Sequence, residues 1–477
     1  MRTSFMLALT IAALSILFFS CGNGSPSLSK KKLQALFSEN DTSLISKNAG
    51  SVSGLFDISQ MDIPYGIKYE ENRTINSGNP PVVIDLSSSK LNTKELDVKQ
   101  LFSSMEFVSL KHPFADSAMF LYNTQIHQKH ENYWMSVTKS TNVIFTGSHI
   151  LTSDIFGINC FNADGSFSHA VCKNQFDKTI DTKNKLIDID MTSFKGHNSE
   201  FLSNNHIIAH NYFNFVDKEY KRVFHDLKNK KSTEVDYRPK QAVPIAVIVD
   251  KDYWIGEYYT HNNNPVMLCS FGMQGDTLCE FSHSEIINKM PTKSYPTPLS
   301  STFYFYNGIF TYNHAYNDTV FRMTGANRLT PAFVMNWGDY KVDINDYVHG
   351  KSAGKMTLKK WIETPMHILL YLYHELENGM YYYAYFDKQL KQVFIHAKTT
   401  EWNHNELINN SLPGGLPISF KGLVATNGKY IAAYTKELLN EIIGSKSFAS
   451  LSEDNKTAVQ EQYNKLNDDE LLVMILQ

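Results

Sequence analysis

Residues 149–172 read HILTSDIFGINCFNADGSFSHAVC, and this stretch carries the pattern that decides the fold. Two short runs, His149–Asp154 and Gly157–Phe161, are followed by the polar turn Asn162–Gly165 and a third run, Ser166–Cys172. Short runs rich in β-branched and aromatic residues, bounded by Gly, Asn and Asp, predict antiparallel strands joined by tight turns. The stretch therefore predicts a three-stranded β-meander.

The same unit recurs four more times along the chain. Its outer turns fall near residues 164, 229, 275, 326 and 388. A repeat of about 45–65 residues with about four strands is typical of a β-propeller blade. The strands of the later copies are predicted at His206–Phe213, Arg222–Asp226 and Ser232–Tyr237; at Tyr253–Tyr259, Pro265–Ser270 and Thr277–Phe281; at Gly308–Tyr312, Asp318–Met323 and Pro331–Trp337; and at Ile368–His374, Met380–Phe386 and Lys391–His396.

The two ends of the chain supply a sixth repeat. Its strands are predicted at Val82–Leu86, Glu106–Leu110, Leu423–Ala425, Tyr430–Tyr434 and Leu471–Leu476. The last of these is apolar throughout, so we expect it to be buried inside the closing blade. The prediction is an all-β fold over residues 81–477, a propeller most simply of six blades of four antiparallel strands. Five or seven blades and a β-sandwich remain alternatives, although this length of meander is long for one sandwich.

Two short helices are predicted near the C-terminus. One covers Thr435–Ile443, and the other covers Ser452–Leu466. Ser452 is the expected N-cap of the second helix, because Glu453 and Asp454 follow in its first turn.

The N-terminus has the features of an export signal. Arg2 precedes an apolar run from Phe5 to Phe19, and Cys21 follows directly after Ser20. This order of basic, apolar and small residues predicts a secretory signal peptide over residues 1–20. Cys21 would be the first mature residue and the lipid attachment site, as in bacterial lipoproteins. The alternative, a transmembrane helix, is disfavoured because spanning a bilayer takes about twenty apolar residues.

Residues 21–80 are predicted to be a tether and N-terminal extension. Gly22–Pro26 is flexible in composition, Lys30–Lys32 is a basic run beside the anchor, and Leu28–Phe37 is compatible with a short amphipathic helix. The expected location is therefore the cell envelope, with the outer membrane and its periplasmic face favoured. The partner that follows is the membrane, through the lipid on Cys21.

Composition excludes one class of partner. The net charge is −3, and charged residues make up 19% of the chain. A nucleic-acid partner would require a basic patch or stripe, so none is expected. Aromatic residues reach 13%, with 26 Tyr and 30 Phe, which agrees with a β-rich core.

Four cysteines remain besides Cys21, namely Cys160, Cys172, Cys269 and Cys279. Cys269 and Cys279 flank the turn around Gly275, so a local disulfide across a hairpin and free buried thiols are both open. The spacings do not match zinc sites, in which paired ligands lie two to four residues apart.

Three stretches resemble a known family. Val83–Leu86 followed by Glu106–Leu110, the segment His149–Val171, and Asp318–Met323 followed by Leu329–Gly338 are similar to blades of the six-bladed β-propeller lipoproteins of Bacteroidota. The ending Asp468–Asp469 before an apolar strand is similar as well. The chain departs from the family after Cys172, where Lys173–Phe176 replaces a Gly-rich loop. Most members are proteins of unknown function, so the resemblance implies architecture and anchoring, and no activity.

No motif for chemistry stands out, and no catalytic residue, metal or cofactor is predicted. His206 and His210 are four residues apart, but on a strand their rings would lie roughly 13 Å apart. Asp188–Asp190 lacks the Gly and Glu of a calcium loop, and a solvated sheet edge is the preferred interpretation. The sequence contains no Gly-x-Ser-x-Gly elbow and no phosphate loop.

Two aromatic runs, Phe303–Tyr306 and Tyr381–Phe386, alternate faces along predicted strands. Half of each run must pack between blades, and the other half either packs too or forms a platform for sugar rings. Core packing is the preferred interpretation. It is also preferred for the five tryptophans, Trp134, Trp254, Trp337, Trp361 and Trp402.

The main functional hypothesis is a non-enzymatic, lipid-anchored propeller that binds a ligand, an envelope protein or a glycan. The candidate binding loops between or within blades are Asp177–Asn198, His261–Pro265, Asn313–Asn317 and Gly338–Pro365. The longest, Gly338–Pro365, holds the polar residues Asp339, Asp343, Asp346, His349 and Lys351.

Two alternatives stay open. The first is a hydrolase or lyase with a metal or His/Asp site at the channel mouth, which would require convergence of polar residues such as Asp154, His210, Glu257, Asn313 and His374. The second is an accessory glycan-binding lipoprotein, which would require coplanar exposed tyrosines or tryptophans on one face.

Overall fold

The computed structural model describes the chain from residue 81 to residue 477 with internal gaps. The gaps are residues 88–90, 114–119, 122–123, 130–133, 140, 147, 182–185, 198–202, 205–206, 215–218, 236–244, 249–252, 258–265, 273–276, 283–301, 307–308, 314–317, 343–351, 376–378, 402–405 and 427–428. The signal segment, Cys21, the tether and the helix expected at Leu28–Phe37 lie outside the described residues.

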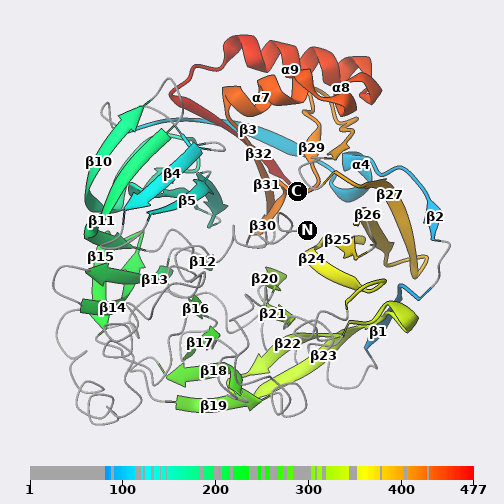
Figure 1. Cartoon of the computed structure of the whole chain (residues 1–477), viewed down its shortest axis with the longest axis horizontal. Helices are drawn as coiled ribbons and strands as arrows, with labels where there is room; N and C mark the ends of the chain where they lie inside the picture. Colours follow the sequence, from blue (N-terminus) through cyan, green and yellow to red (C-terminus); the bar gives the residue numbers. More distant parts are fainter. Residues whose placement is uncertain are drawn as a thin grey trace.

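Six sheets surround a common centre, which confirms the predicted six-bladed β-propeller (Figure 1). Blade 1 contains β6 (Asn142–Phe145), β7 (His149–Asp154), β8 (Gly157–Asn162) and β9 (Phe167–Lys173). Blade 2 contains β12 (Ser203–Asn204), β13 (Ile207–Asn214), β14 (Glu219–Asp226) and β15 (Lys231–Val235). Blade 3 contains β16 (Ile245–Ile248), β17 (Tyr253–Glu257), β18 (Val266–Gly272) and β19 (Thr277–Ser282).

The remaining three blades include strands from both ends of the chain. Blade 4 contains β20 (Thr302–Tyr306), β21 (Ile309–Asn313), β22 (Thr319–Gly325), β23 (Arg328–Asn336) and β1 (Val82–Asp85). Blade 5 contains β24 (Met356–Glu363), β25 (His367–His374), β26 (Met380–Asp387), β27 (Gln392–Thr399) and β2 (Asn92–Thr93). Blade 6 contains β30 (Val424–Thr426), β31 (Lys429–Tyr434), β32 (Glu470–Leu476) and β3 (Met105–Lys111).

Blade 6 closes the ring. β32 lies between β31 and β3, and Leu471–Leu476 are all buried, as predicted. The prediction for Val82–Leu86 is wrong, because β1 pairs in parallel with β23 of blade 4. An outer strand needs only one partner, and the exposed Val82 and Val83 face solvent at this rim.

The hydrophobic core is divided among the spaces between blades. One cluster joins blades 4 and 5 through residues such as Tyr304, Met335, Leu370 and Phe386. Equivalent clusters lie between blades 5 and 6, 6 and 1, 1 and 2, and 3 and 4. Between blades 2 and 3, Phe224 contacts Trp254 edge to face. Packing by a neighbour on both faces explains why the strands are apolar with little alternation.

Tight turns connect the strands within each blade. In the turn between β7 and β8, the Asp154 carboxylate accepts a hydrogen bond from the Phe156 N–H at 2.8 Å. Gly157 follows with φ +139°, and a Cβ there would lie 2.3 Å from the carbonyl oxygen of Cys172. Asp387 similarly accepts from the N–H groups of Gln389 and Leu390 in the turn after β26. These are the conformations for which Asp and Gly are selected.

The alternation of strand direction gives the propeller two different faces. At one face, which we call the short-turn face, consecutive strands are joined by only two to four residues, as between β14 and β15. The opposite face, which we call the long-connection face, receives the longer segments. These include residues 258–265, 283–301, 337–355, 400–423 and 435–469.

Two insertions on the long-connection face pair with each other. The hairpin of β4 (Thr124–Lys129) and β5 (Trp134–Lys139) precedes blade 1, and that of β10 (Gln175–Asp181) and β11 (Leu186–His197) follows it. β4 and β11 pair in parallel, and the far end of β11 pairs with β13 of blade 2. The interpretation of Asp177–Asn198 as a loop is therefore wrong. The segment is rich in charged residues and was not recognised as two strands, which form by pairing with distant segments.

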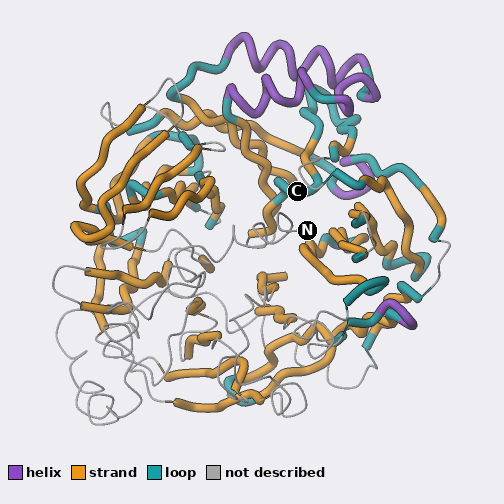
Figure 2. Tube along the Cα trace, viewed as in Figure 1, coloured by secondary structure: helices purple, strands orange, loops and turns teal. Residues whose placement is uncertain are grey.

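Helices fill the connection between β31 and β32 (Figure 2). The described helices here are α7 (Lys436–Gly444), α8 (Lys446–Ser450) and α9 (Glu453–Lys465). Both predicted helices are confirmed, with Thr435 and Ser452 as N-caps that accept from Leu438 N–H and Asn455 N–H. α8 had no clear sequence pattern. No helix in the described part of the chain has the length and apolar character that a bilayer crossing requires.

Candidate functional site

Three of the five polar residues that the sequence marked on second strands are described with their side chains. Asp154, Asn313 and His374 end β7, β21 and β25 at the long-connection face. Asp154 bonds within the turn that follows it, Asn313 Nδ2 donates to the Thr319 carbonyl at 3.0 Å, and His374 Nε2 contacts the Gly354 carbonyl at 3.1 Å. Each is buried in its own blade, and the side chains of His210 and Glu257 lie outside the described set.

The histidines and aspartates considered as metal ligands are described only in part. His206 lies outside the described residues. Asp188 and Asp190 lie on β11, which pairs with β10 on one side and β4 on the other, so the interpretation of this segment as a sheet edge is wrong. Where residues are described, no group of three or more His, Cys, Asp or Glu side chains is arranged to hold a metal ion.

The four described cysteines are free thiols. In the β18–β19 ladder, Cys269 is opposite Glu280, and Cys279 is opposite Ser270. Cys269 and Cys279 therefore point to opposite faces of the sheet, and no disulfide joins them. Burial raises the pKa of the Cys160 thiol to about 12 and also raises that of Cys172, so both are inert core groups.

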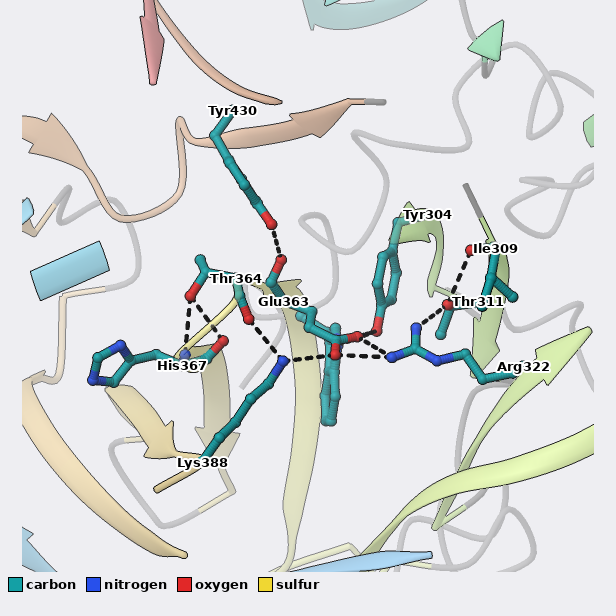
Figure 3. Close-up of polar contacts among 10 residues, drawn as sticks. Tyr304, Ile309, Thr311, Arg322, Glu363, Thr364, His367, Lys388 and Tyr430 are labelled. Atoms are coloured by element: carbon teal, nitrogen blue, oxygen red, sulfur yellow. Dashed lines mark hydrogen bonds and ion pairs between the residues drawn. The ribbon is translucent and has the colours of Figure 1, made fainter. Parts of the chain in front are cut away.

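A charged network that sequence reasoning missed lies between blades 4, 5 and 6 near the short-turn face (Figure 3). Its centre is Glu363, at the end of β24. Arg322 Nη2 from β22 donates to Glu363 Oε1 and Oε2 at 2.8 and 2.7 Å, and Lys388 Nζ donates to Oε1 at 2.8 Å. Tyr304 Oη from β20 donates to Oε2 at 2.7 Å. The carboxylate thus accepts four hydrogen bonds.

The network continues through neutral groups. Trp361 Nε1 donates to Tyr304 Oη at 2.6 Å, and Tyr430 Oη from β31 donates to the Glu363 carbonyl at 2.5 Å. Tyr306 stacks beneath both cations, with its ring centroid 5.0 Å from the Arg322 guanidinium carbon and 4.6 Å from Lys388 Nζ. These contacts connect three blades through one residue.

Charge pairing overcomes burial at Glu363. Burial would raise the pKa of this carboxyl, but the charges of Arg322 and Lys388 outweigh it and hold the pKa below its usual range. Burial lowers the pKa of Lys388, although Glu363 opposes the shift. Burial and the adjacent carboxylate hold the pKa of Tyr304 well above its usual range. Because the Glu363 side chain is only 1% exposed, this network locks blades together and offers no open carboxylate for chemistry.

A second group of side chains lies toward the long-connection face, on the side of blade 5 that faces blade 6. We call it the tyrosine–lysine cluster, and it consists of Tyr371, Tyr373, Tyr381, Tyr383, Lys359, Lys360 and Lys421. The tyrosines come from β25 and β26, where Tyr371 is opposite Tyr383 and Tyr373 is opposite Tyr381. Lys360 on β24 is opposite Tyr371, and Lys421 precedes β30.

Three of the four rings of the tyrosine–lysine cluster are stacked, and that of Tyr373 is tilted by 38° from Tyr381. Tyr371 stacks with Tyr381 at 5.6 Å and 12° and with Tyr383 at 5.2 Å and 25°. Lys421 Nζ lies 4.8 Å from the Tyr371 ring centroid, and Lys359 Nζ lies 5.5 Å from that of Tyr373. Such positions are favourable for ammonium groups over aromatic rings.

The aromatic runs partly follow the prediction. Tyr383 and Tyr385 pack toward blade 6, whereas Ala384 and Phe386 pack toward blade 4, so both faces of β26 are used between blades. In this run Tyr381 and Tyr382, near the start of β26, stay partly exposed; in the other run Tyr304 and Phe305 are buried and Tyr306 is partly exposed. Trp254, Trp337 and Trp361 are buried, as expected, whereas the side chain of Trp134 and all of Trp402 lie outside the described residues.

One weak signal could have identified both groups. Arg322 is the single charge of the otherwise apolar strand β22, and Lys359, Lys360 and Glu363 are the charges of β24. A charge that cannot reach solvent must be paired, so isolated charges in central strands mark buried polar networks. Sequence spacing does not reveal which strand supplies the partner.

Comparison with known proteins gives a family and a fold. A family model described as a domain of unknown function, DUF4933, matches residues 64–445. No curated protein matches the sequence.

One similar solved structure is a protein of Bacteroides fragilis NCTC 9343 that is named as an exported protein. It is 10% identical, with a TM-score of 0.47, over 83% of this chain and 99% of that chain. A DUF4221 family member from Bacteroides vulgatus ATCC 8482 is 7% identical, with a TM-score of 0.26, over 78% and 98%. The periplasmic gluconolactonase of Pseudomonas aeruginosa is 11% identical, with a TM-score of 0.32, over 70% and 92%.

Proposed function

The chain belongs to the DUF4933 family, whose function is unknown, and on that premise we propose that it is a lipid-anchored binding propeller of the cell envelope. Its recognition surface is the long-connection face. The proposal rests on one observation: the β4–β5 and β10–β11 hairpins, the helices α7–α9 and the hairpin of β28 (Leu407–Ile408) and β29 (Ile418–Ser419) all belong to connections at that face. Binding residues occur preferentially on connections held by a rigid scaffold.

The anchoring part of the proposal comes from the sequence. The lipid on Cys21 would hold the protein at the outer membrane, with the periplasmic side favoured. In cells fed an alkyne-labelled fatty acid, the wild-type protein should take up label and fractionate with membranes. A Cys21→Ala variant that still carries label and stays in the membrane fraction contradicts the anchor.

Cross-linking in living cells tests the recognition surface. A photoreactive amino acid replaces exposed Asp339, beside the long-connection face, or exposed Gln389, in a turn at the short-turn face. Adducts of higher mass are expected from position 339 and not from position 389. Adducts from position 389 alone, or equally from both positions, would place recognition elsewhere and refute the proposal.

An enzyme site at the channel mouth is not proposed. Asp154, Asn313 and His374 were the described residues whose convergence would have supported it, and each bonds within its own blade. Glu363, the most charge-rich centre among the described residues, has its carboxylate engaged by Arg322 and Lys388.

A further inference from the structure

The tyrosine–lysine cluster gathers chemical groups of one kind at one place. Lys360, Tyr371 and Tyr383 form a row across three adjacent strands, and Tyr373 and Tyr381 form the next row toward the long-connection face. Lys421 joins from the segment before β30, and Lys360 Nζ donates to its carbonyl oxygen. Three amines and four phenols thus come from β24, β25, β26 and the segment before β30.

The amines of this cluster are partly removed from water. Lys360, Lys421, Tyr371, Tyr373 and Tyr381 are half-buried, and Lys359 beside them is exposed. Burial lowers the pKa of Lys360 and of Lys421 to about 8. A positive charge that is partly removed from water is destabilised, and an anion placed beside it would relieve that cost.

The tyrosines supply a complementary surface. Burial raises the pKa of Tyr371 and of Tyr381, so their hydroxyls stay protonated, and that of Tyr371 is hydrogen-bonded to Tyr383. Half-buried Tyr371 and Tyr381 have nearly parallel rings, and the buried Tyr383 supports Tyr371 from beneath the surface. An aromatic face with a polar rim suits a ring that is apolar on its faces and hydroxylated at its edge, which describes a sugar.

Two acidic residues near the cluster each affect the pKa of one of its members. Glu375 opposes the lowering of the pKa of Lys359, and Glu406 helps raise the pKa of Tyr383. For Lys360 and Lys421, burial is the cause of the lowered pKa. The deeper lysines are therefore the ones on which an incoming acid group would act most strongly.

We propose that the tyrosine–lysine cluster binds an acidic saccharide, with its carboxylate or sulfate group on Lys360 and Lys421 and its ring against the half-buried tyrosines. This inference rests on the proposed binding function and specifies its ligand class. Charge-assisted hydrogen bonds to the amines would supply most of the affinity. The tyrosine hydroxyls and ring edges would supply the selectivity for a sugar.

Three polymers with one backbone test the proposal: dextran, carboxymethyl-dextran and dextran sulfate. The full-length protein in detergent should bind at least one of the charged polymers and not the neutral one, as measured by calorimetry. The identity of the bound polymer then distinguishes a carboxylate ligand from a sulfate ligand. Raising the pH from 7 to 9.5 should weaken binding, because Lys360 and Lys421 lose their protons in that range. Binding to neutral dextran as well, or to none of the three, overturns the inference.

Matched lysine variants separate this site from general surface charge. Lys421→Met keeps the side-chain stem, removes the amine and should lower affinity by roughly tenfold. Lys359→Met, at an exposed position that folding tolerates, should weaken binding as well. Lys446→Met, on exposed α8 at the far side of the helices, should leave affinity unchanged. Equal losses in Lys446→Met, or unchanged affinity in both cluster variants, refute the site.

The two proposals fail in different experiments. Cross-links at position 339 with no dextran binding would retain the long-connection face as the recognition surface and reject the acidic saccharide. Dextran binding without adducts at position 339 would place the saccharide on the cluster and reject the wider face as the site of recognition.

Discussion

Glu363 shows how one residue can connect three blades of a ring. It receives Arg322 and Tyr304 from blade 4, Lys388 from its own blade and, at its carbonyl, Tyr430 from blade 6. Burying this ion pair is costly in itself, and a hydrophobic replacement of the whole network would be tolerated better than the loss of one member. The energetic importance of Glu363 therefore appears when it alone is changed.

Glu363→Gln should lower the free energy of unfolding by about 3–5 kcal/mol, because Arg322 and Lys388 stay buried without their anion. Urea denaturation at pH 7 measures the change. Glu461→Gln, which removes an exposed partner of Lys465 on α9, should change stability by less than about 0.5 kcal/mol. The lowered pKa of Glu363 also predicts how stability depends on pH. The stabilisation by its carboxylate is present above about pH 4.5 and is lost as the pH falls below that value. A Glu363→Gln protein as stable as wild type at pH 7 would contradict this account.

Asp154 should behave in the opposite way. Burial raises its pKa to about 6, so the folded state binds a proton more readily than the unfolded state does. The stabilisation by protonated Asp154 is complete below about pH 4 and is lost as the pH rises toward 6. Asp154→Asn should therefore match wild type at pH 3.5 and exceed it by about 1–3 kcal/mol at pH 7.5. Denaturation at the two pH values checks this, with exposed Asp164→Asn as a control that shows no gain. A loss of stability at pH 7.5 would show that the charged form is needed.

At the scale of residues, the sequence predicted types of environment better than partners. Ser452 as an N-cap and the buried tryptophans Trp254, Trp337 and Trp361 follow from local rules of capping and burial. The pairing of Arg322 with Glu363 joins positions forty-one residues apart on different blades. No local rule selects that partner from the other acidic residues.

At the scale of elements, the sequence predicted strands correctly where burial of the strand requires an apolar run of residues. The sequence located the second, third and fourth strands of blades 1 to 5 well, because they form apolar runs between turns. It missed the first strands β6, β12 and β16, and the prediction of Gly338–Pro365 as one loop is wrong, because β24 covers Met356–Glu363. β10 and β11 were missed because Gln175–His197 is rich in Asp, Lys and Thr and lacks an apolar run. Their strand structure depends on long-range pairing with β4 and β13, which tertiary context supplies.

Helix α9 is attached to the propeller by one buried amide. Asn455 Nδ2 donates to the carbonyl oxygens of Asn410 and Gly415 at 2.7 and 3.0 Å, and Asn455 Oδ1 accepts from Asn410 N–H at 2.8 Å. The segment that follows β28 is thereby held against the helix. These three bonds satisfy backbone groups that would otherwise be buried without partners.

Asn455→Ala should lower the free energy of unfolding by about 2–4 kcal/mol, because three buried backbone groups lose their partners together. Chemical denaturation measures the loss, and amide hydrogen exchange should show earlier opening of residues 407–418. Gln460→Ala, at an exposed position of the same helix, is the matched control and should have little effect. Similar small effects of both substitutions would mean that α9 is held by its apolar contacts alone.

At the scale of the whole molecule, ring closure was predicted from both chain ends, and its exact composition was not. β3 and β32 close blade 6 as expected, but β1 extends blade 4 as a parallel outer strand. The apolar character of Val82–Leu86 resembles that of a closing strand, and only the spatial position of the N-terminal segment distinguishes the two roles. The difference predicts how the ring responds to shortening at either end.

Deletion of residues 470–477 should abolish the cooperative unfolding of the propeller. β32 is the central strand of blade 6, and its Leu471, Val473 and Ile475 side chains fill the core between blades 6 and 1. Without it, β3 and β31 lose their shared partner and the ring opens. A chain that begins at residue 91 is the matched control, because β1 is the one described strand that it loses, and it should unfold cooperatively at a modestly lower temperature. Size-exclusion chromatography and thermal circular dichroism compare the two proteins. Cooperative melting of the 470–477 deletion near the wild-type temperature would mean that closure does not depend on β32.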